Sequence, residues 1–205
     1  MSDPVAATVR AYDLHAVAYA ELTAAPSASV RAAVERFAAG VGAGGRVLEV
    51  GSGGGRDAAL MEDLGLRVRR TDVTPGFVAL LREQGHAADL LDPLVDDLPS
   101  PEGPYDGVWA NASLLHVARA DLPAVQTRLA AVTRQGGLLH VSVKEGVGEG
   151  WSTHGAVRAP RHFTYWQADT VRGAVTGTGW NDIEVARSDG DGNTQAWLEV
   201  TAVRG

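Results

Sequence analysis

Short apolar runs alternate with stretches of helical periodicity along most of the chain. Strand-like runs occur at residues 46–50, 105–110 and 138–143, and Val68 marks a further strand. Between these runs, apolar residues recur at the three- and four-residue spacing of an amphipathic helix. Strands that alternate with helices form a mostly parallel sheet with both faces covered, so the pattern predicts an α/β protein with a doubly wound sheet.

Glycine and proline mark the ends of most of the predicted helices. Near the N-terminus, Val5, Val9, Tyr12, Ala16 and Tyr19 form one stripe at helical spacing, which predicts a helix there. Further helices are predicted from about Ser29 to Gly40, from the glycines at 51–55 to Gly65, from Thr74 to Gly85, from Asp121 to Gly136-Gly137, and from about Gln167 to Thr178.

The last quarter of the chain has a different pattern. Ile183 and Val185 alternate with polar residues, and the positions from Ala196 to Ala202 do the same. The segment 189–193 between them consists of Asp, Gly and Asn, which favour turns. The pattern predicts a C-terminal hairpin that adds an antiparallel strand to the sheet.

Length and composition suit one globular domain. The chain has 205 residues, 45% of them apolar and 21% charged, which fits a single domain over residues 1–205. The absence of cysteine excludes disulfides and thiolate chemistry. The formal net charge of −7 disfavours a nucleic acid partner, because a phosphate backbone is also negative.

Nothing in the sequence indicates a membrane or a metal. No segment reaches the roughly 18 consecutive apolar residues of a spanning helix. The start, Met1-Ser2-Asp3-Pro4, lacks the basic and apolar parts of a signal peptide. No cluster of Asp, Asn and His forms an oxygen-rich cation site. We therefore expect a cytoplasmic protein with no required metal.

A glycine-rich loop follows the first predicted strand and leads into a helix. It reads Gly51-Ser52-Gly53-Gly54-Gly55. Glycine permits a sharp turn and lets a ligand touch the backbone, and the N-terminus of the following helix favours negative groups. Asp72 ends the next strand, where a carboxylate can accept hydrogen bonds from both hydroxyls of a ribose. The combination predicts a nucleotide-like ligand.

Two classes of cofactor use this layout. Dinucleotide loops read G-x-G-x-x-G/A; the register that starts at Gly51 fails at Arg56, whereas the register that starts at Gly53 fits. The acid in front of the loop decides between the two classes. Glu49-x-Gly51-x-Gly53-x-Gly55 resembles the motif of class I S-adenosylmethionine (SAM) methyltransferases.

The resemblance covers roughly residues 46 to 200. The segment Tyr105–Val117 resembles the fourth-strand motif of small bacterial members, and Gln135-Gly136-Gly137 stands where they usually have Pro-Gly-Gly. The family fold is a seven-stranded sheet whose last strand runs antiparallel, which agrees with the C-terminal hairpin. The resemblance therefore implies a Rossmann-like SAM methyltransferase fold.

The resemblance also implies a site for SAM and for its product, S-adenosylhomocysteine (SAH). Asp72 matches the ribose-binding acid, Asp89 the acid that meets the adenine amino group, and Leu90 a neighbour of the adenine. The implied cofactor residues are Glu49, Gly51, Gly53, Gly55, Arg56, Asp72, Asp89, Leu90, Asn111, Tyr12 and Tyr19.

Two parts of this set have structural alternatives. The segment with Tyr12 and Tyr19 resembles the family's N-terminal helix, which folds over the cofactor, so residues 1–40 are candidates for a lid. A core stripe is the alternative role for these tyrosines. Arg56 either pairs with the cofactor carboxylate or forms an ion pair with Asp57 or Glu62.

His116 and Lys144 are candidates for the acceptor side, because they follow the fourth and fifth strands at the carboxyl edge of the sheet. His116 is a possible general base, or else a histidine that packs under the loop and hydrogen-bonds the backbone. Lys144, the only lysine, pairs either with an acceptor carboxylate or with Glu145 or Glu149.

The stretch 151–166 is basic and aromatic and contains no acidic residue. Arg158, Arg161 and Tyr165 within it are candidates for binding an acceptor that is flat, anionic or both. The alternative is a surface loop whose aromatic side chains pack on the sheet. After the fourth strand, Asn111-Ala112-Ser113-Leu114 departs from the Asn/Asp-Pro-Pro-Tyr/Phe motif of relatives that methylate amide or nucleobase nitrogens, which disfavours such substrates.

These features predict a SAM-dependent methyltransferase that acts on an oxygen or nitrogen nucleophile of a small molecule or peptide end, as a monomer or homodimer. One alternative is a SAM-binding protein of the same fold with non-methylating chemistry, such as a cyclisation. A nicotinamide-dependent oxidoreductase is disfavoured by the spacing of the glycines, by the two helices that precede them and by the terminal hairpin.

Overall fold

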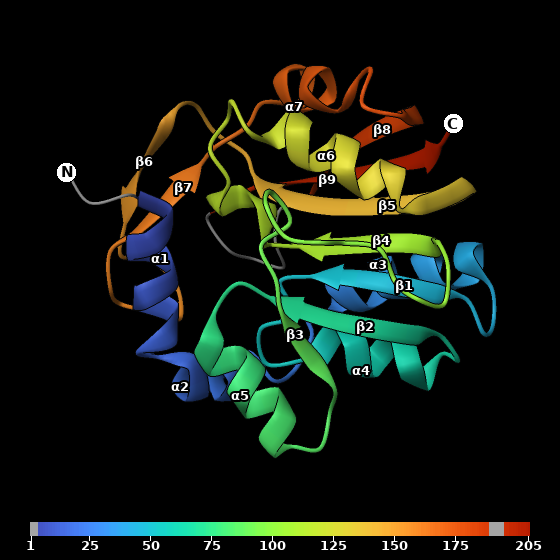
Figure 1. Cartoon of the computed structure of the whole chain (residues 1–205). Coiled ribbons are helices and arrows are strands. Elements are labelled where there is room, and N and C mark those ends of the chain that lie inside the picture. The colour runs from blue at the N-terminus through green and yellow to red at the C-terminus, as the bar shows by residue number, and fades with distance from the viewer. Residues whose placement is uncertain (1–3, 189–194) are drawn as a thin grey trace.

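The computed structural model describes residues 4–188 and 195–205 and has a seven-stranded sheet at its centre (Figure 1). The strands lie in the order β3-β2-β1-β4-β5-β9-β8. Strands β1 to β5 pair in parallel, whereas β9 is antiparallel to both β5 and β8. The predicted sheet, mostly parallel with an antiparallel C-terminal hairpin, is confirmed. The strands are β1 (Arg46–Val50), β2 (Arg67–Asp72), β3 (Ala88–Leu90), β4 (Tyr105–Asn111), β5 (Thr133–Lys144), β8 (Trp180–Ser188) and β9 (Trp197–Arg204).

Helices cover both faces of this sheet. On one face, α3 and α4 pack against Val47 and Trp109; on the other, α6 and α7 pack against Leu48 and Val108. Successive residues of a strand point to opposite faces, which is why Val47 and Leu48 belong to different cores. The helices are α1 (Pro4–Asp13), α2 (Ala16–Leu22), α3 (Ala28–Val41), α4 (Arg56–Asp63), α5 (Pro75–Glu83), α6 (Leu122–Ala131) and α7 (Ala168–Val175), with a 3-10 turn, η1 (Leu114–His116).

The N-terminal helices and a small hairpin lie beyond the carboxyl ends of the central strands (Figure 1). The hairpin consists of β6 (Glu149–Ser152) and β7 (Arg161–Thr164), which pair in antiparallel orientation. A loop was the expectation for this segment. Instead, Trp151 and His162 face each other across the two strands with ring centroids 5.4 Å apart, and such cross-strand pairs stabilise a hairpin.

The helix predicted over the N-terminal stripe is split into two. Helix α1 ends at Asp13, whose carboxylate accepts the backbone N–H of Gly76 at 2.6 Å, and α2 begins at Ala16. The break brings the rings of Tyr12 and Tyr19 within 5.4 Å of each other. Seven residues of unbroken helix would separate the two positions by about 10 Å along the axis. The two tyrosines therefore meet only because the helix is interrupted.

Two other helix ends differ from the predicted ones. Helix α3 starts after Ser27, whose hydroxyl accepts the N–H of Val30 at 3.3 Å, and it continues to Val41. Helix α6 ends at Ala131, so Gly136-Gly137 lie inside β5 instead of closing the helix. Gly136 has a φ of +72°, a conformation that glycine adopts without strain, and it lets the backbone bend within the strand.

The turn predicted at 189–193 lies outside the described residues. Within residues 4–188 and 195–205, no helix has both the length and the apolar character needed to cross a bilayer.

Candidate active site

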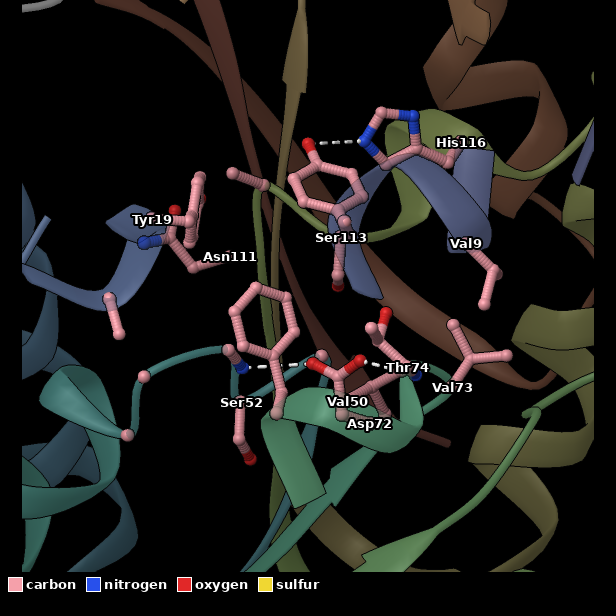
Figure 2. Close-up of a pocket in the computed structure, with 18 of the residues that line it drawn as sticks. Val9, Tyr19, Val50, Ser52, Asp72, Val73, Thr74, Asn111, Ser113 and His116 are labelled. Atoms are coloured by element: carbon pink, nitrogen blue, oxygen red, sulfur yellow. Dashed lines mark hydrogen bonds between the residues drawn. The ribbon is translucent and has the colours of Figure 1, made fainter. Parts of the chain in front are cut away.

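A cavity of about 570 Å³ opens at the carboxyl ends of β1, β2 and β4, next to α1 and α2. Small-molecule sites typically enclose roughly 300–1,000 Å³. Figure 2 shows Tyr19 and Asn111 toward one end of the cavity, and Val9 and Val73 toward the other. The predicted site residues that line it are Tyr12, Tyr19, Gly51, Gly53, Gly55, Arg56, Asp72, Asn111 and His116.

The glycine loop forms one wall of the cavity, and its glycines allow close packing against other elements. A Cβ on Gly51 would lie 2.3 Å from the Cβ of Ser113, and the φ of Gly51 is +81°. A Cβ on Gly54 would lie 2.8 Å from the Cβ of Ala20 in α2. Real Cβ atoms do not approach this closely, so larger residues would push η1 and α2 away from the loop.

Asp72 fixes the shape of this loop from the end of β2. Its carboxylate accepts the backbone N–H of Gly53 at 2.9 Å and that of Thr74 at 2.8 Å, as Figure 2 shows. Burial raises the pKa of Asp72, and the same two N–H groups oppose that rise. The carboxylate is buried in the protein and still lines the cavity, so it can hold the loop and accept hydrogen bonds from a ligand.

Glu49 lies beneath the loop and is not among the residues that line the cavity. Its carboxyl group is buried and accepts the hydroxyl of Ser52 at 2.5 Å. Burial, with repulsion from Asp57, raises the pKa of Glu49 to about 8. The structure therefore places Glu49 as a support of the glycine loop rather than at its ligand-facing surface.

Asp89 and Leu90 lie away from the cavity. The carboxylate of Asp89 accepts the guanidinium of Arg69 at 2.7 Å, and Leu90 is exposed. The cavity is lined instead by the next two residues, Leu91 and Asp92. The reason is the end of β3 at Leu90, after which the chain turns toward the cavity. Sequence reasoning missed Asp92, although the neighbouring proline was a signal that the strand had ended.

A hydrogen-bonded network around Asp57 lies directly after the glycine loop, at the start of α4. The guanidinium of Arg56 donates to Asp57 at 3.1 Å and to the carbonyl of Thr23 at 2.9 Å. Asn111 donates its side-chain amide to Asp57 at 2.7 Å and accepts the hydroxyl of Ser142 at 2.5 Å. Of the two pairings predicted for Arg56, the structure shows the one with Asp57, while Arg56 also lines the cavity.

Aromatic side chains from α1, α2 and α5 close the cavity opposite Asp72. The ring centroids of Tyr12 and Tyr19 lie 6.0 and 5.4 Å from that of Phe77. All three residues line the cavity. Burial raises the pKa of Tyr19 to about 12, so its hydroxyl stays protonated and can donate a hydrogen bond. Phe77 is a lining residue that the sequence analysis assigned only to a helix.

Comparisons with known proteins agree with this architecture. A family model described as a methyltransferase domain matches residues 48–141. The structure superimposes on the Burkholderia thailandensis 1,6-didemethyltoxoflavin-N1-methyltransferase, solved with 1,6-didemethyltoxoflavin and SAH, with a TM-score of 0.74 and 21% identity over 100% of this chain and 91% of that one. The likeness to this structure shows the fold, and the match to the methyltransferase-domain model agrees with the predicted resemblance to class I SAM-dependent methyltransferases.

Two other similar proteins differ from each other in their named activities. The [4+2]-cyclase SpnF matches with a TM-score of 0.75 and 15% identity over 99% of this chain and 97% of that one. A ubiquinone biosynthesis O-methyltransferase of Xanthomonas axonopodis pv. citri (strain 306) is 35% identical over 105 residues. That alignment covers 49% of this chain and 43% of the relative, so the chain matches less than half of the relative's length.

The cavity offers polar groups and open backbone suited to an adenosyl ligand. The glycines of the loop line it with backbone that carries no side chain. Asp72 offers a carboxylate beside that wall. The hydroxyl of Ser113 is buried at the cavity and has no hydrogen-bond partner in the described part of the chain, which is unusual for a buried polar group. A polar ligand in this position would give Ser113 its missing partner.

His116 lies in the cavity wall as a neutral, hydrogen-bonded histidine. Its Nδ1 donates to the backbone carbonyl of His162 at 2.6 Å, which leaves Nε2 to accept the hydroxyl of Tyr12 at 3.0 Å. Burial lowers the pKa of His116 to about 3; Arg161 and Lys144 act in the same direction, and the bond to His162 opposes them. The packing alternative predicted for His116 matches these contacts, although the ring also lines the cavity.

Lys144 is paired with neither of the acids predicted as its alternative partners. Glu145 accepts the guanidinium of Arg187 at 2.7 Å, and Glu149 accepts the backbone N–H of Arg119 at 2.8 Å. The Nζ of Lys144 lies instead over the Phe163 ring, 3.8 Å from its centroid. Burial, with repulsion from Arg161, lowers the pKa of Lys144 to about 8.

The other predicted acceptor residues lie on or near β7, outside the lining of the cavity. Arg161 is buried, and its guanidinium donates to the hydroxyl of Tyr12 at 3.2 Å, so it touches a lining residue. Tyr165 packs beside Phe163 with ring centroids 6.2 Å apart. Arg158 is exposed and is not among the residues that line the cavity. Of the two arginines predicted as acceptor residues in this segment, only Arg161 therefore contacts a residue that lines the cavity.

Proposed function

We propose that this protein is a SAM-dependent methyltransferase that acts on an oxygen or nitrogen nucleophile of a small molecule or peptide end. The observation that carries the proposal is the glycine loop that lines the cavity beside the buried carboxylate of Asp72, at the carboxyl edge of the seven-stranded sheet. Open α/β sheets bind nucleotide ligands at that edge. The methyltransferase-domain match over residues 48–141 supports the same function.

Different residues of the cavity would bind different parts of SAM. Asp72 would accept hydrogen bonds from the ribose hydroxyls, and Asp92, in place of the predicted Asp89, would face the purine end. The loop from Gly51 to Gly55 would lie against the adenosyl and methionine portions, with Arg56, Asn111 and Ser113 as polar neighbours. When bound, SAM supplies a methyl group that is already electrophilic, so the protein mainly has to place and align the nucleophile.

The chain's own residues then exclude water and orient the acceptor. Tyr12, Tyr19 and Phe77 close the cavity with apolar ring surface, which limits solvent access. His116 is a weak candidate for a general base, because its Nε2 already accepts the Tyr12 hydroxyl and nearby cations oppose its protonation. We propose that catalysis here depends on proximity and electrostatics rather than on proton removal by His116.

We also propose that residues 1–205 form one catalytic domain that works in the cytoplasm as a monomer or homodimer, without a nucleic acid partner or a required metal. The formal net charge of −7 supports the exclusion of nucleic acid, because it opposes binding to a phosphate backbone.

Transfer of a labelled methyl group is the direct test. The protein is incubated with SAM labelled in the methyl group and with a panel of small hydroxylated, carboxylated and aminated molecules. Label that appears in an extractable product supports methyl transfer. SAH binding without transfer to any compound, accompanied by an unlabelled conversion, would favour the non-methylating alternative that the similarity to a [4+2]-cyclase keeps open. A thermal shift with NAD but not with SAH would indicate the oxidoreductase.

A further inference from the structure

The cationic side chains of Lys144 and Arg161 both lie against the ring of Phe163, beside the candidate active site. The Nζ of Lys144 lies 3.8 Å from the centroid of the Phe163 ring, and the Cζ of Arg161 lies 5.2 Å from the same centroid. Arg161 is only 3% exposed, and Lys144 is half-buried. We call Lys144, Arg161 and Phe163 the cationic cluster.

The cationic cluster has no carboxylate partner among residues 4–188 and 195–205. The guanidinium of Arg161 donates only to neutral groups: the carbonyls of His154 and Ala159 and the hydroxyl of Tyr12. Burying a charge without an opposite charge is costly, and proteins normally pair such groups. A buried arginine and a neighbouring lysine without an acid therefore indicate that the compensating charge comes from a ligand.

The cluster lies directly behind one wall of the cavity. Arg161 donates to the hydroxyl of Tyr12 at 3.2 Å, and the Phe163 ring lies 4.7 Å from the ring of His116. Tyr12 and His116 both line the cavity, and Figure 2 shows His116 with its hydrogen bond at the cavity's edge. Arg161 and Lys144 thus make the potential at this wall positive, at a distance over which charges in a partly buried site still interact strongly.

The same potential acts on the titratable groups of the wall. The pKa of His116 is lowered to about 3, mainly by burial and further by Arg161 and Lys144. The pKa of Lys144 itself is lowered to about 8, mainly by burial and further by Arg161. Burial disfavours a charge of either sign, but the part of the pKa shift that comes from Arg161 and Lys144 is one that a negative charge in the same place would gain from.

We propose that the acceptor carries an anionic group, such as a carboxylate, and binds at the wall formed by Tyr12 and His116, where its charge compensates Arg161 and Lys144. This inference rests on the proposed function and narrows its substrate class to small acidic molecules. The flexible stem of Lys144 lets its ammonium group reach the ligand, while Arg161 acts through the Tyr12 hydroxyl and through its charge. Lys144 and Arg161 are thus specificity-determining residues.

The test compares an acid with its neutral amide on SAH-saturated protein. We would measure the dissociation constants of 2-naphthoate and 2-naphthamide, a pair of aromatic probes of nearly equal shape, by calorimetry or ligand-observed NMR. The proposal predicts that the native protein binds the acid about tenfold or more tightly than the amide, as expected for a charge-assisted contact. K144M and R161M should each remove most of this preference, with little effect on the amide.

Matched variants separate the cluster from general effects of charge. R158M removes a positive charge from the same segment at an exposed position and should leave the preference unchanged. D189N/D191N controls for two acids outside the described residues and should also leave it unchanged. If R161M proves unstable, K144M alone decides, because that side chain is only half-buried.

Several results would overturn the proposal: equal affinity for acid and amide, no binding of the acid at millimolar concentration, a preference that survives in K144M, or tighter binding of the acid by D189N/D191N. SAH affinity, measured on the same samples, is expected to stay within about twofold in every variant. Failure of the acid test with normal SAH binding rejects only this inference. Failure of the native protein to bind SAH rejects the proposed function itself.

Discussion

Three acids of the candidate site have very different surroundings, and those surroundings decide what each one can do. Asp72 accepts two backbone N–H groups and still lines the cavity. Glu49 is enclosed beneath the loop, where it accepts the Ser52 hydroxyl. Asp89 is half-exposed and pairs with Arg69. The three carboxylates therefore have three different surroundings: one lies at the cavity, one lies beneath the loop and one forms a surface ion pair.

Substitution of individual acids should separate the residues that face the ligand from those that do not. D72N and D92N should each weaken SAH binding by about tenfold or more, because each replaces a carboxylate acceptor at the cavity. D89N should change SAH affinity by less than about twofold, since Asp89 faces Arg69 instead. Calorimetric titration of the three variants provides the measurement. A large loss in D89N with none in D92N would restore Asp89 as the purine-binding acid.

Glu49 should make the stability of the protein depend on pH near neutrality. Its folded-state pKa of about 8 lies above the ordinary value of 4.5, so the folded protein holds this proton more tightly than the unfolded chain does. The resulting stabilisation is complete below pH 4.5 and is lost as the pH rises through 8. Relative to the native protein, E49Q should gain a few kcal/mol of unfolding free energy between pH 5 and 8, since each pKa unit corresponds to about 1.4 kcal/mol.

Urea denaturation of the native protein and E49Q at both pH values checks this expectation. If the two proteins keep the same difference in unfolding free energy at pH 5 and pH 8, Glu49 does not titrate in this range, and the buried, protonated state inferred from the structure is wrong.

Sequence spacing placed Asp72 at the cavity, where the structure also has it, whereas Asp89 lies away from the cavity, and the difference has a physical cause. Asp72 follows a long strand that starts soon after a well-marked loop, so its place at the sheet edge could be counted. Strand β3 has only three residues, and an error of one position turns a side chain to the opposite face. The contacts of Asp89 with Arg69 and of Glu49 with Ser52 depend on folding of the whole chain, which no local spacing reveals.

At the scale of whole elements, the closure of the cavity depends on how α2 packs against the glycine loop. Gly54 touches Ala20 so closely that a Cβ there would come within 2.8 Å of the Ala20 Cβ. The sequence predicted helical structure in this region but not the break between α1 and α2. That break is stabilised from outside the segment, by the hydrogen bond between Asp13 and Gly76 of α5.

Substitution of Gly54 tests the contact between α2 and the loop. G54A should weaken SAH binding by about tenfold, because the added methyl group pushes α2 away from the cavity. G54A/A20G removes one of the two clashing atoms and should recover part of the affinity, despite the cost of about 1 kcal/mol for glycine in a helix. SAH titrations of both variants and of A20G alone give the comparison. Equal SAH affinity in G54A and the native protein would contradict the expectation that close packing of α2 against the loop is needed for SAH binding.

The hairpin of β6 and β7 is a second element that the sequence pattern did not predict. The segment is basic and aromatic, as expected, but it was predicted as a loop. The pairing of its strands could not be predicted, because the two strands have only four residues each. What the composition could not reveal is that Arg161 is buried beside Phe163 while Arg158, three positions earlier, is exposed.

At the scale of the whole molecule, the sequence predicted the main sheet and its helices. The alternation of strands and helices, the glycine loop and the terminal hairpin all depend on local patterns, whereas the seven-stranded sheet was implied by the family resemblance. The cavity forms where β1 and β4 lie side by side and their connections leave in opposite directions. The hydrogen bond between Tyr12 and His116 joins residues 104 positions apart in the sequence, and no local pattern predicts such a contact.

Global stability should fall in mild acid because two histidines are buried in neutral form. The pKa values of His116 and His140 are both lowered to about 3 by burial, against an ordinary 6.5. The unfolded chain binds these protons first, so the free energy of unfolding should decrease as the pH falls from 6.5 toward 3. His140 stacks on Trp109 with ring centroids 3.9 Å apart.

H140Q removes one of these groups and should flatten the dependence on pH. The slope of unfolding free energy between pH 6 and 4, measured by chemical denaturation, is compared between H140Q and the native protein, because the absolute stability also changes when the stacking is lost. An unchanged slope would show that His140 is not the buried neutral base that its surroundings imply.

Binding of the adenosyl moiety of SAM in the cavity beside Gly51–Gly55 and Asp72 is the basis of the proposed function. It can be measured by isothermal titration of the native protein with SAH. We expect one site per chain with a dissociation constant of about 100 μM or tighter, and a loss of about tenfold or more in D72N. No detectable heat with SAH, or the same affinity in D72N as in the native protein, would contradict it.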